Sequence, residues 1–345
     1  MKNSYSRRAF LRTLGLIGLG ASIPAPALAA VKMADVTRLT GNRVKVSETR
    51  FLMGTFVAIT AIHESRTLAE HGVGLAFEEI ERLSAIFDRH RDNTPVSRLN
   101  DEGRLGDITP ELHNMMREAL AYTELTVGAY DPTVLPVVEM LRDKAAPTGR
   151  MDISEAELKE ALALVDAKAI HVSGNEIRFD KQGMGITLDG MGKGYIVDRA
   201  SDVLNKAGVA NHMINAGGDM RARGERTPGK PWTVAIEDPA GKGKYPALIE
   251  LRNAAIATSG GYEASYNASG SRHHVIDPRT ALSPTRSVSV SVVAPTVMQA
   301  DALSTAAFVM HPKDGVRFIN TLPQCETLII GDSGVKLTSR HWKQC

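Results

Sequence analysis

Leu188-Asp189-Gly190-Met191-Gly192-Lys193-Gly194-Tyr195 places three glycines at alternate positions, just before an apolar, helix-periodic run that Gly208 ends. Glycine has no Cβ, so its backbone can approach a ligand closely, and a helix start with a lysine favours phosphate binding. The segment is not a Walker A loop, because glycine rather than serine or threonine follows Lys193, and it lacks the G-x-G-x-x-G spacing. The alternative interpretation is a tight turn before a surface helix.

The sequence on either side of this segment indicates a globular α+β protein. The chain has 345 residues, 43% of them hydrophobic and 23% charged, which suits a substantial core. Apolar spacing predicts helices over 68–87, 110–126, 154–165, 195–207 and 297–310, and strands over 51–60 (broken at Gly54), 170–172, 176–179, 209–214, 232–236, 247–251, 254–258 and 288–293. Loops are expected over 88–100 and 142–152, and a linker over 30–50. The predicted fold is therefore mainly antiparallel sheets flanked by helices, in a domain over 51–345.

The N-terminus reads as an export signal. Ser6-Arg7-Arg8-Ala9-Phe10-Leu11 is a twin-arginine pattern, followed by an apolar region over 14–23 and an A-x-A cleavage site over 27–29. We therefore expect residues 1–29 to be a signal peptide and the mature protein to be periplasmic, without a lipoprotein anchor, since no cysteine lies near the cleavage site. Residues 1–29 hold four cations and no acid, so their removal takes the formal net charge from +2 to −2. That charge gives no support for nucleic-acid binding.

The chain has two cysteines, Cys325 and Cys345. In an oxidising compartment they could pair and tie down the C-terminal tail. Two cysteines are too few for an all-cysteine zinc or iron–sulfur site.

Asp301 and Thr305 are four residues apart on one face of an otherwise apolar helix. A carboxylate and a hydroxyl in such surroundings need partners. One interpretation is a buried polar pair that bonds to the backbone. The other is a site for a hard cation such as magnesium, which prefers oxygen ligands and leaves positions for water and phosphate.

Two further segments carry candidate functional groups. His273-His274 is either a pair of surface histidines or supplies a general base or a phosphate-contacting group near neutral pH. We take His274 as the catalytic candidate. Thr258-Ser259-Gly260-Gly261-Tyr262 offers hydroxyls and glycines that suit a phosphate or a close backbone approach.

Eight motifs in one order, spread over about 51–310, resemble the ApbE family of FAD:protein FMN transferases. They are Met53-Gly54-Thr55, Ser97-Arg98-Leu99-Asn100, Gly128-x-Tyr130-Asp131-Pro132-Thr133, Gly192-Lys193-Gly194-Tyr195-x-x-Asp198, Asn215-Ala216-Gly217-Gly218-Asp219, Ala257-Thr258-Ser259-Gly260, His274-Val275-Ile276-Asp277-Pro278-Arg279-Thr280 and Ala300-Asp301-Ala302-Leu303-Ser304-Thr305.

The resemblance implies an α+β fold with FAD in a cleft, a magnesium requirement, and transfer of FMN to a threonine hydroxyl of a partner protein with release of AMP. By position it assigns Met53, Ala129, Tyr130 and Asp131 to the flavin or adenosine part of the cleft, Lys193 and Val275 to contacts with FAD, and Asp301, Thr305 and the Gly190 carbonyl to magnesium. The implied partner is an acceptor flavoprotein with an Asp-x-x-Ser/Ala-Thr motif. Asp301 to Thr305 loosely resembles that motif, but we interpret it as the metal helix.

Three features depart from the family pattern. Thr187 stands where the family has an FAD-contacting aspartate, and Asp189 follows two residues later, so both are assigned to the cofactor. The alternative for Asp189 is that it adds a metal ligand. His90 replaces a tyrosine and is likewise expected to contact the cofactor. A twin-arginine signal stands in place of the lipoprotein signal that is common in the family. In this respect the chain resembles the subgroup that accompanies nitrous-oxide respiration.

Two other functions fit the same residues. A magnesium-dependent FAD pyrophosphatase would use water as the acceptor and release FMN and AMP. A non-catalytic periplasmic flavin-binding protein would leave Asp301 and Thr305 as structural residues.

Overall fold

A computed structural model of the chain describes residues 32–144, 153–241, 245–262, 265–266 and 272–344. The predicted signal peptide and Cys345 lie outside these residues, as does most of the loop expected over 142–152. Within the described ranges, no helix is both long enough and apolar enough to cross a membrane. Cys325 is a buried free thiol.

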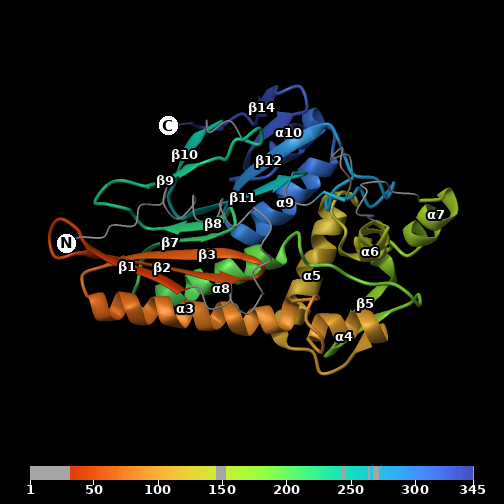
Figure 1. Ribbon diagram of the computed structural model, residues 1–345, viewed down its shortest axis with the longest axis horizontal. Helices are drawn as coiled ribbons and strands as arrows, with labels where there is room; N and C mark the ends of the chain where they lie inside the picture. The colour runs from red at the N-terminus through yellow and green to blue at the C-terminus, as the bar shows by residue number, and fades with distance from the viewer. Residues whose placement is uncertain (1–31, 145–152, 242–244, 263–264, 267–271, 345) are drawn as a thin grey trace, which may run out of the picture.

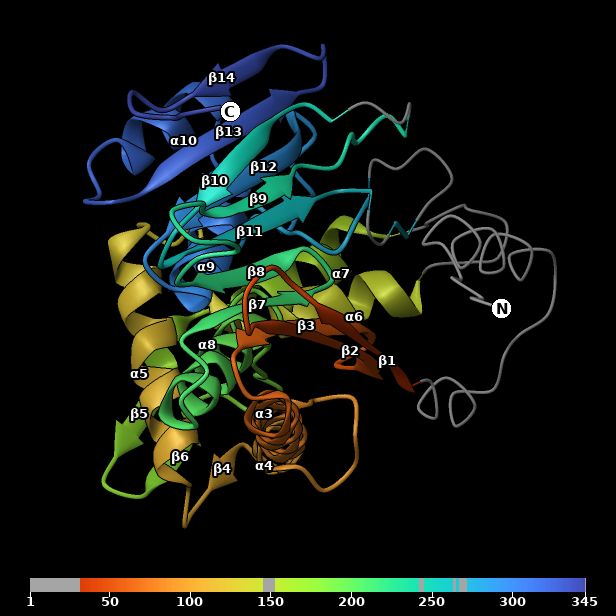
Figure 2. The ribbon, with the colours of Figure 1, turned by 90° about the vertical axis from the view of Figure 1, so that its left-hand side faces the viewer.

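The described residues form a nine-stranded main sheet in which every neighbouring pair is antiparallel. From one edge to the other it contains β1 (Lys32–Arg38), β2 (Val44–Leu52), β3 (Thr55–His63), β7 (Asn211–Ala216), β8 (Asp219–Arg223), β11 (Ala254–Gly260), β12 (Ser287–Ala294), β13 (Glu326–Gly331) and β14 (Lys336–Thr338). Figure 2 looks along the helix α3 (Arg66–Phe87) and shows the strands one above another, from β3 up to β14. The α+β prediction is confirmed.

The helices pack mainly on one face of this sheet. They are α3 (Arg66–Phe87), α8 (Gly192–Lys206), α9 (Val297–Val309) and α10 (Pro312–Ile319). An antiparallel pair of β9 (Trp232–Ala235) and β10 (Leu248–Leu251) packs its apolar side chains against the main sheet, and together they form a second core cluster. Successive side chains of β13 point to opposite faces of the sheet. Ile329 packs in the core beneath the helices, whereas Leu328 and Ile330 pack in the core beneath β9 and β10.

A second group of elements lies beside the sheet (Figure 1). It consists of α4 (Pro95–Glu102), α5 (Pro110–Leu125), η1 (Pro132–Val134), α6 (Leu135–Asp143), α7 (Glu155–Ala163), η2 (Ala167–Ala169) and a small sheet of β4 (Arg104–Leu105), β6 (Glu176–Phe179) and β5 (Ile170–Ser173). A capping box begins α7, since Ser154 and Glu157 bond to each other's backbone N–H groups.

Two regions that the sequence predicted to be irregular contain regular secondary structure. The linker expected over 30–50 contains β1 and most of β2, which pair antiparallel from Lys32↔Arg50 to Arg38↔Val44. Strand β1 is largely exposed, so backbone pairing holds it in the sheet and no apolar alternation marks it. The loop expected over 88–100 contains most of α4. The side chain of its N-cap residue, Thr94, accepts the N–H of Ser97, and Pro95 lies in the first turn.

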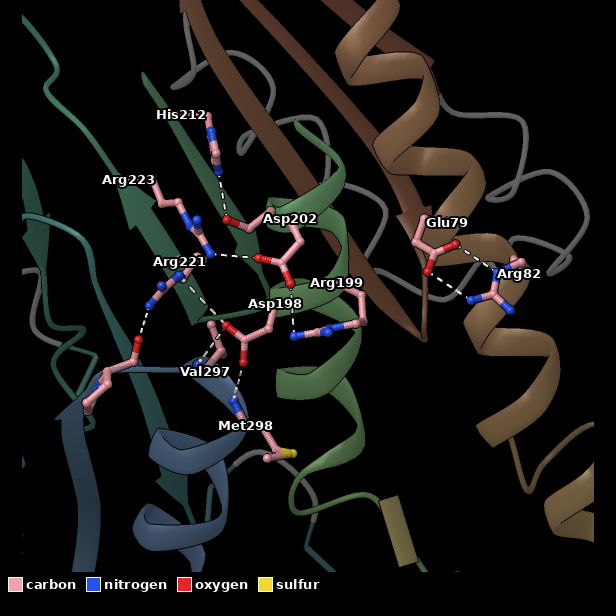
Figure 3. Close-up of polar contacts among 12 residues, drawn as sticks. Glu79, Arg82, Asp198, Arg199, Asp202, His212, Arg221, Arg223, Val297 and Met298 are labelled. Atoms are coloured by element: carbon pink, nitrogen blue, oxygen red, sulfur yellow. Dashed lines mark hydrogen bonds and ion pairs between the residues drawn. The ribbon is translucent and has the colours of Figure 1, made fainter. Parts of the chain in front are cut away.

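Helix α8 docks onto the start of α9 through a buried carboxylate. Asp198 accepts the N–H groups of Val297 at 3.1 Å and Met298 at 2.9 Å (Figure 3). Arg221, from β8, lies 3.8 Å from the same carboxylate and bonds to the carbonyl of Pro295. Burial raises the pKa of Asp198, although these N–H groups and Arg221 oppose the shift. The motif residue Asp198 therefore caps α9 and fixes its position.

A buried histidine joins β7 to α8 and should make stability depend on pH. His212 Nδ1–H donates to the Val209 carbonyl at 2.7 Å. Its Nε2 therefore accepts from the Ser201 hydroxyl at 2.7 Å, and Figure 3 shows the His212 ring pointing toward α8. Burial lowers the pKa of His212 from 6.5 to about 4. The unfolded chain thus binds this proton before the folded one, and stability is lost as pH falls from 6.5 towards 4.

Urea unfolding of the wild type and His212→Gln across this pH range tests the prediction. We expect His212 to contribute up to about 3 kcal/mol to the wild-type decrease, and this part of the slope should be missing in His212→Gln. Parallel stability curves would contradict it.

Candidate functional site

Two adjoining cavities lie where the main sheet meets α3, α8 and α9. The larger is a cleft of about 1260 Å³, and the smaller has about 140 Å³. Asp189, Lys193 and Thr258 line both, so the two form one continuous site. The larger cleft exceeds the volume of many small-ligand pockets, which run to about 1,000 Å³, and it suits a dinucleotide.

Two hairpin tips border the larger cleft. Met53 and Gly54 form the turn between β2 and β3, with φ of 53° and 71°. The break predicted at Gly54 is therefore this turn, with residues 51–52 at the end of β2 and residues 55–60 in β3. Gly217 and Gly218 form the β7–β8 turn, with φ of 65° and 108°. A Cβ on Gly217 would come within 2.5 Å of Thr55 Oγ1, so the two tips abut.

Lys193 is anchored where the cavities meet. Its Nζ lies 2.9 Å from Asp219 Oδ2, and the Asp219 side chain is only 4% exposed. The β7–β8 turn places Asp219 there. Burial raises the pKa of Asp219, while the Lys193 ammonium acts against that shift. Lys193 is thereby held in the first turn of α8 with its side chain one-third exposed to the cleft.

The three residues predicted to bind metal meet in the smaller cavity. Asp301 is 6% exposed and accepts the Gly194 N–H at 3.3 Å. Thr305 lies one turn further along α9, and a Cβ on Gly190 would come within 3.1 Å of its Oγ1. We call Gly190, Asp301 and Thr305 the α9 corner. Its carboxylate, hydroxyl and backbone carbonyl are the oxygen donors that magnesium prefers.

Serine hydroxyls surround this corner. Ser259 Oγ lies 2.8 Å from Ser304 Oγ and 3.4 Å from Thr305 Oγ1, and Ser304 donates to the Asp301 carbonyl at 3.0 Å. The Thr258-Ser259 segment therefore supports α9 from β11. In the part of the chain that the structure describes, no three His, Cys, Asp or Glu side chains cluster around a possible metal position. The α9 corner offers one carboxylate, that of Asp301, beside a hydroxyl and a backbone carbonyl, and magnesium sites commonly use one or two carboxylates.

The geometry can be compared with known proteins. A family model, described as the ApbE family, matches residues 53–329. The chain belongs to the ApbE family. It is 31% identical to an FAD:protein FMN transferase of Haemophilus influenzae, over 68% of this chain and 72% of the relative.

Solved ApbE structures share the fold. The ApbE protein of Thermotoga maritima superposes with a TM-score of 0.78 at 29% identity, covering 86% of this chain and 97% of that one. The flavin transferase ApbE of Vibrio cholerae gives a TM-score of 0.71 at 28% identity, covering 90% and 97%.

Two positions that depart from the ApbE pattern, Thr187 and Asp189, bond to each other, and Asp189 also pairs with Arg89. Asp189 Oδ2 accepts from Arg89 Nη2 at 2.8 Å and Nε at 3.0 Å, and the Asp189 N–H donates to Thr187 Oγ1 at 3.2 Å. Although desolvation opposes them, the Arg89 guanidinium and the Thr187 hydroxyl lower the pKa of the half-exposed Asp189 carboxyl. Sequence reasoning missed Arg89, which is 100 positions away from its partner. His90 lines the larger cleft.

The segment before η1 lines the smaller cavity with Ala129, Tyr130 and Asp131. Asp131 accepts the N–H of Thr133 at 2.8 Å and its hydroxyl at 2.5 Å, so it caps η1. Tyr130 is 4% exposed, and no hydrogen-bond partner for its hydroxyl exists among the described residues. Burial raises the pKa of Tyr130 well above 10, with Asp301 the next contributor.

The two adjacent histidines have different environments. His273 is 3% exposed, its Nε2 bonds to the Pro284 carbonyl at 2.8 Å, and its ring stacks edge-on against Phe308. His274 and Val275 line the smaller cavity. His273 is thus structural, and His274 is the histidine that reaches the site. Every residue proposed from the sequence as catalytic, cofactor-binding or metal-binding lines one of the two cavities.

Proposed function

We propose that this ApbE-family chain transfers the FMN part of FAD to a threonine hydroxyl of an acceptor protein and releases AMP. The observation that carries the proposal is the α9 corner, whose three residues come from two distant segments and meet beside Lys193. The printed names of the relatives, FAD:protein FMN transferase and flavin transferase, support the same activity.

The α9 corner fits magnesium, and we propose Asp301, Thr305 and the Gly190 carbonyl as its ligands. When bound, magnesium would neutralise diphosphate charge and polarise the attacked phosphorus. The protein's own part is positioning and charge complementarity. Lys193, held by Asp219, would face the diphosphate at the junction of the cavities, while the larger cleft would hold the rest of FAD.

His274 is the proposed base for the acceptor threonine. As the threonine oxygen bonds to the FMN phosphorus, the anhydride bond to AMP breaks, AMP leaves with that electron pair, and the threonine proton passes to a base. A neutral imidazole suits this transfer near pH 7. His274 lines the smaller cavity together with Asp301 and Thr305.

The cellular setting is also a proposal. The twin-arginine pattern at Arg7-Arg8 and the A-x-A site support export to the periplasm. The acceptor would be a flavoprotein with an accessible Asp-x-x-Ser/Ala-Thr motif. Such an acceptor fits periplasmic electron transfer, including nitrous-oxide respiration.

The proposal is tested with purified protein, FAD, magnesium and an acceptor domain that carries the motif. We expect AMP release together with flavin fluorescence on the acceptor in a denaturing gel, and we expect EDTA to abolish both and added magnesium to restore them. AMP and free FMN without labelling, for several acceptors, would indicate a pyrophosphatase. Bound FAD without either product would indicate a flavin-binding protein.

A further inference from the structure

A chain of three hydroxyl groups runs from β11 to the α9 corner. It joins Ser259 on β11 to Ser304 and Thr305 on α9. Ser259 Oγ lies 2.8 Å from Ser304 Oγ and 3.4 Å from Thr305 Oγ1. Both serines are buried, so these hydroxyls depend on one another for hydrogen bonds. Neither serine has a part in the proposed function.

The direction of each hydrogen bond in this chain follows from counting hydrogens. A serine or threonine hydroxyl donates one hydrogen bond and accepts through its lone pairs. Ser304 donates to the Asp301 carbonyl at 3.0 Å, which uses its only hydroxyl hydrogen. Ser304 must therefore accept from Ser259, and this bond uses the hydroxyl hydrogen of Ser259 in turn. Ser259 is left able only to accept from Thr305.

The same count decides what Thr305 presents to the smaller cavity, which it lines. Ser259 is the one hydrogen-bond partner of the Thr305 hydroxyl among the described residues. With its hydrogen directed at Ser259, Thr305 turns only lone pairs to the cavity, and lone pairs bind a hard cation but repel an anion. The separation of 3.4 Å is long for two hydroxyls. A hydroxyl bound to a divalent cation is a stronger donor, which favours the same direction.

We propose that Ser259 is a positioning residue for the metal at the α9 corner. It accepts the Thr305 hydroxyl hydrogen and thereby turns the Thr305 lone pairs towards the cation, while Ser304 fixes the direction of the chain. Ser259 acts through Thr305 and does not itself bind the cation. The inference rests on the proposed function and deepens it, because it makes Thr305 a ligand for a cation and excludes it as a direct donor to phosphate.

Ser259→Ala removes the acceptor and lets the Thr305 hydroxyl turn. Mn²⁺ uses the same oxygen ligands as magnesium, and the electron paramagnetic resonance signal of the free ion is lost on binding, so the ligand-free protein can be titrated directly. We expect Ser259→Ala to bind Mn²⁺ about tenfold more weakly than the wild type, as when a group that orients a metal ligand is removed. Thr305→Val, which exchanges the hydroxyl for a methyl group, should lose at least as much.

A double-mutant cycle distinguishes this role from a general structural one. In a Thr305→Val background, Ser259→Ala should weaken Mn²⁺ binding no further, because its effect passes through the Thr305 hydroxyl. Ser201→Ala is the matched control, since Ser201 is a fully buried serine that bonds to His212 and lines neither cavity. It should keep the wild-type Mn²⁺ affinity even where stability falls.

Three results would overturn the inference: wild-type Mn²⁺ affinity in Ser259→Ala, additive losses in the cycle, or an equal loss in Ser201→Ala. Wild-type protein that binds no Mn²⁺ would remove the proposed metal site and the inference together. Wild-type protein that binds Mn²⁺ and shows the expected cycle, but yields neither AMP nor a labelled acceptor, would overturn the proposed transfer reaction alone.

Discussion

Asp301→Asn is expected to reduce FMN transfer by at least about 10³-fold while the protein stays folded. Asp301 is the one carboxylate of the α9 corner and is 6% exposed. Asparagine keeps its size and an oxygen that can accept the Gly194 N–H, but it loses the negative charge that binds a divalent cation. Metal ions contribute several kcal/mol to charge stabilisation in the transition state, and each 1.36 kcal/mol corresponds to a factor of about ten in rate.

The measurements are initial rates of AMP release over a magnesium titration, together with magnesium affinity. FAD binding should weaken but remain measurable, because Lys193 and the larger cleft are unchanged. Asp314→Asn is the control, since Asp314 is an exposed acid at the start of α10 that pairs with Arg317. Wild-type rates and magnesium dependence in Asp301→Asn would remove the metal-site hypothesis.

Gly194→Ala is expected to destabilise the protein by about 1–3 kcal/mol or more. A Cβ on Gly194 would lie 2.7 Å from backbone atoms of Val297 and Met298, and backbone at the start of a helix cannot rotate away as a side chain can. Relief requires α8 and α9 to separate. The hydrogen bonds from α9 to Asp198 and from Gly194 to Asp301 would then lengthen, so activity should fall as well.

Gly192→Ala provides a control for stability in the same segment. The nearest atom to a Cβ on Gly192 is Leu188 Cβ at 3.6 Å, which is ordinary van der Waals contact. Alanine also favours helix over glycine by about 1 kcal/mol. Urea unfolding should therefore show a large loss for Gly194→Ala and little or none for Gly192→Ala. Equal stability of the two variants would contradict the steric argument.

Local signals in the sequence were sufficient for much of the fold. Apolar spacing predicted the helices over 68–87, 110–126 and 154–165, which correspond to α3, α5 and α7. The i, i+4 spacing placed Asp301 and Thr305 together because helix geometry alone determines it. The linker prediction over 30–50 was wrong because β1, an edge strand, is held by backbone pairing that leaves no apolar pattern.

The sequence by itself determined the residue types of the site, the segments that carry them and, through the order of its motifs, the ApbE family. Tertiary structure alone decided which of those groups meet. It brought Gly190 against Thr305, paired Arg89 with Asp189, and assigned His273 to the core and His274 to the cavity. The physical reason is that helix and turn formation depends on neighbours in the chain, whereas these contacts depend on how distant elements pack.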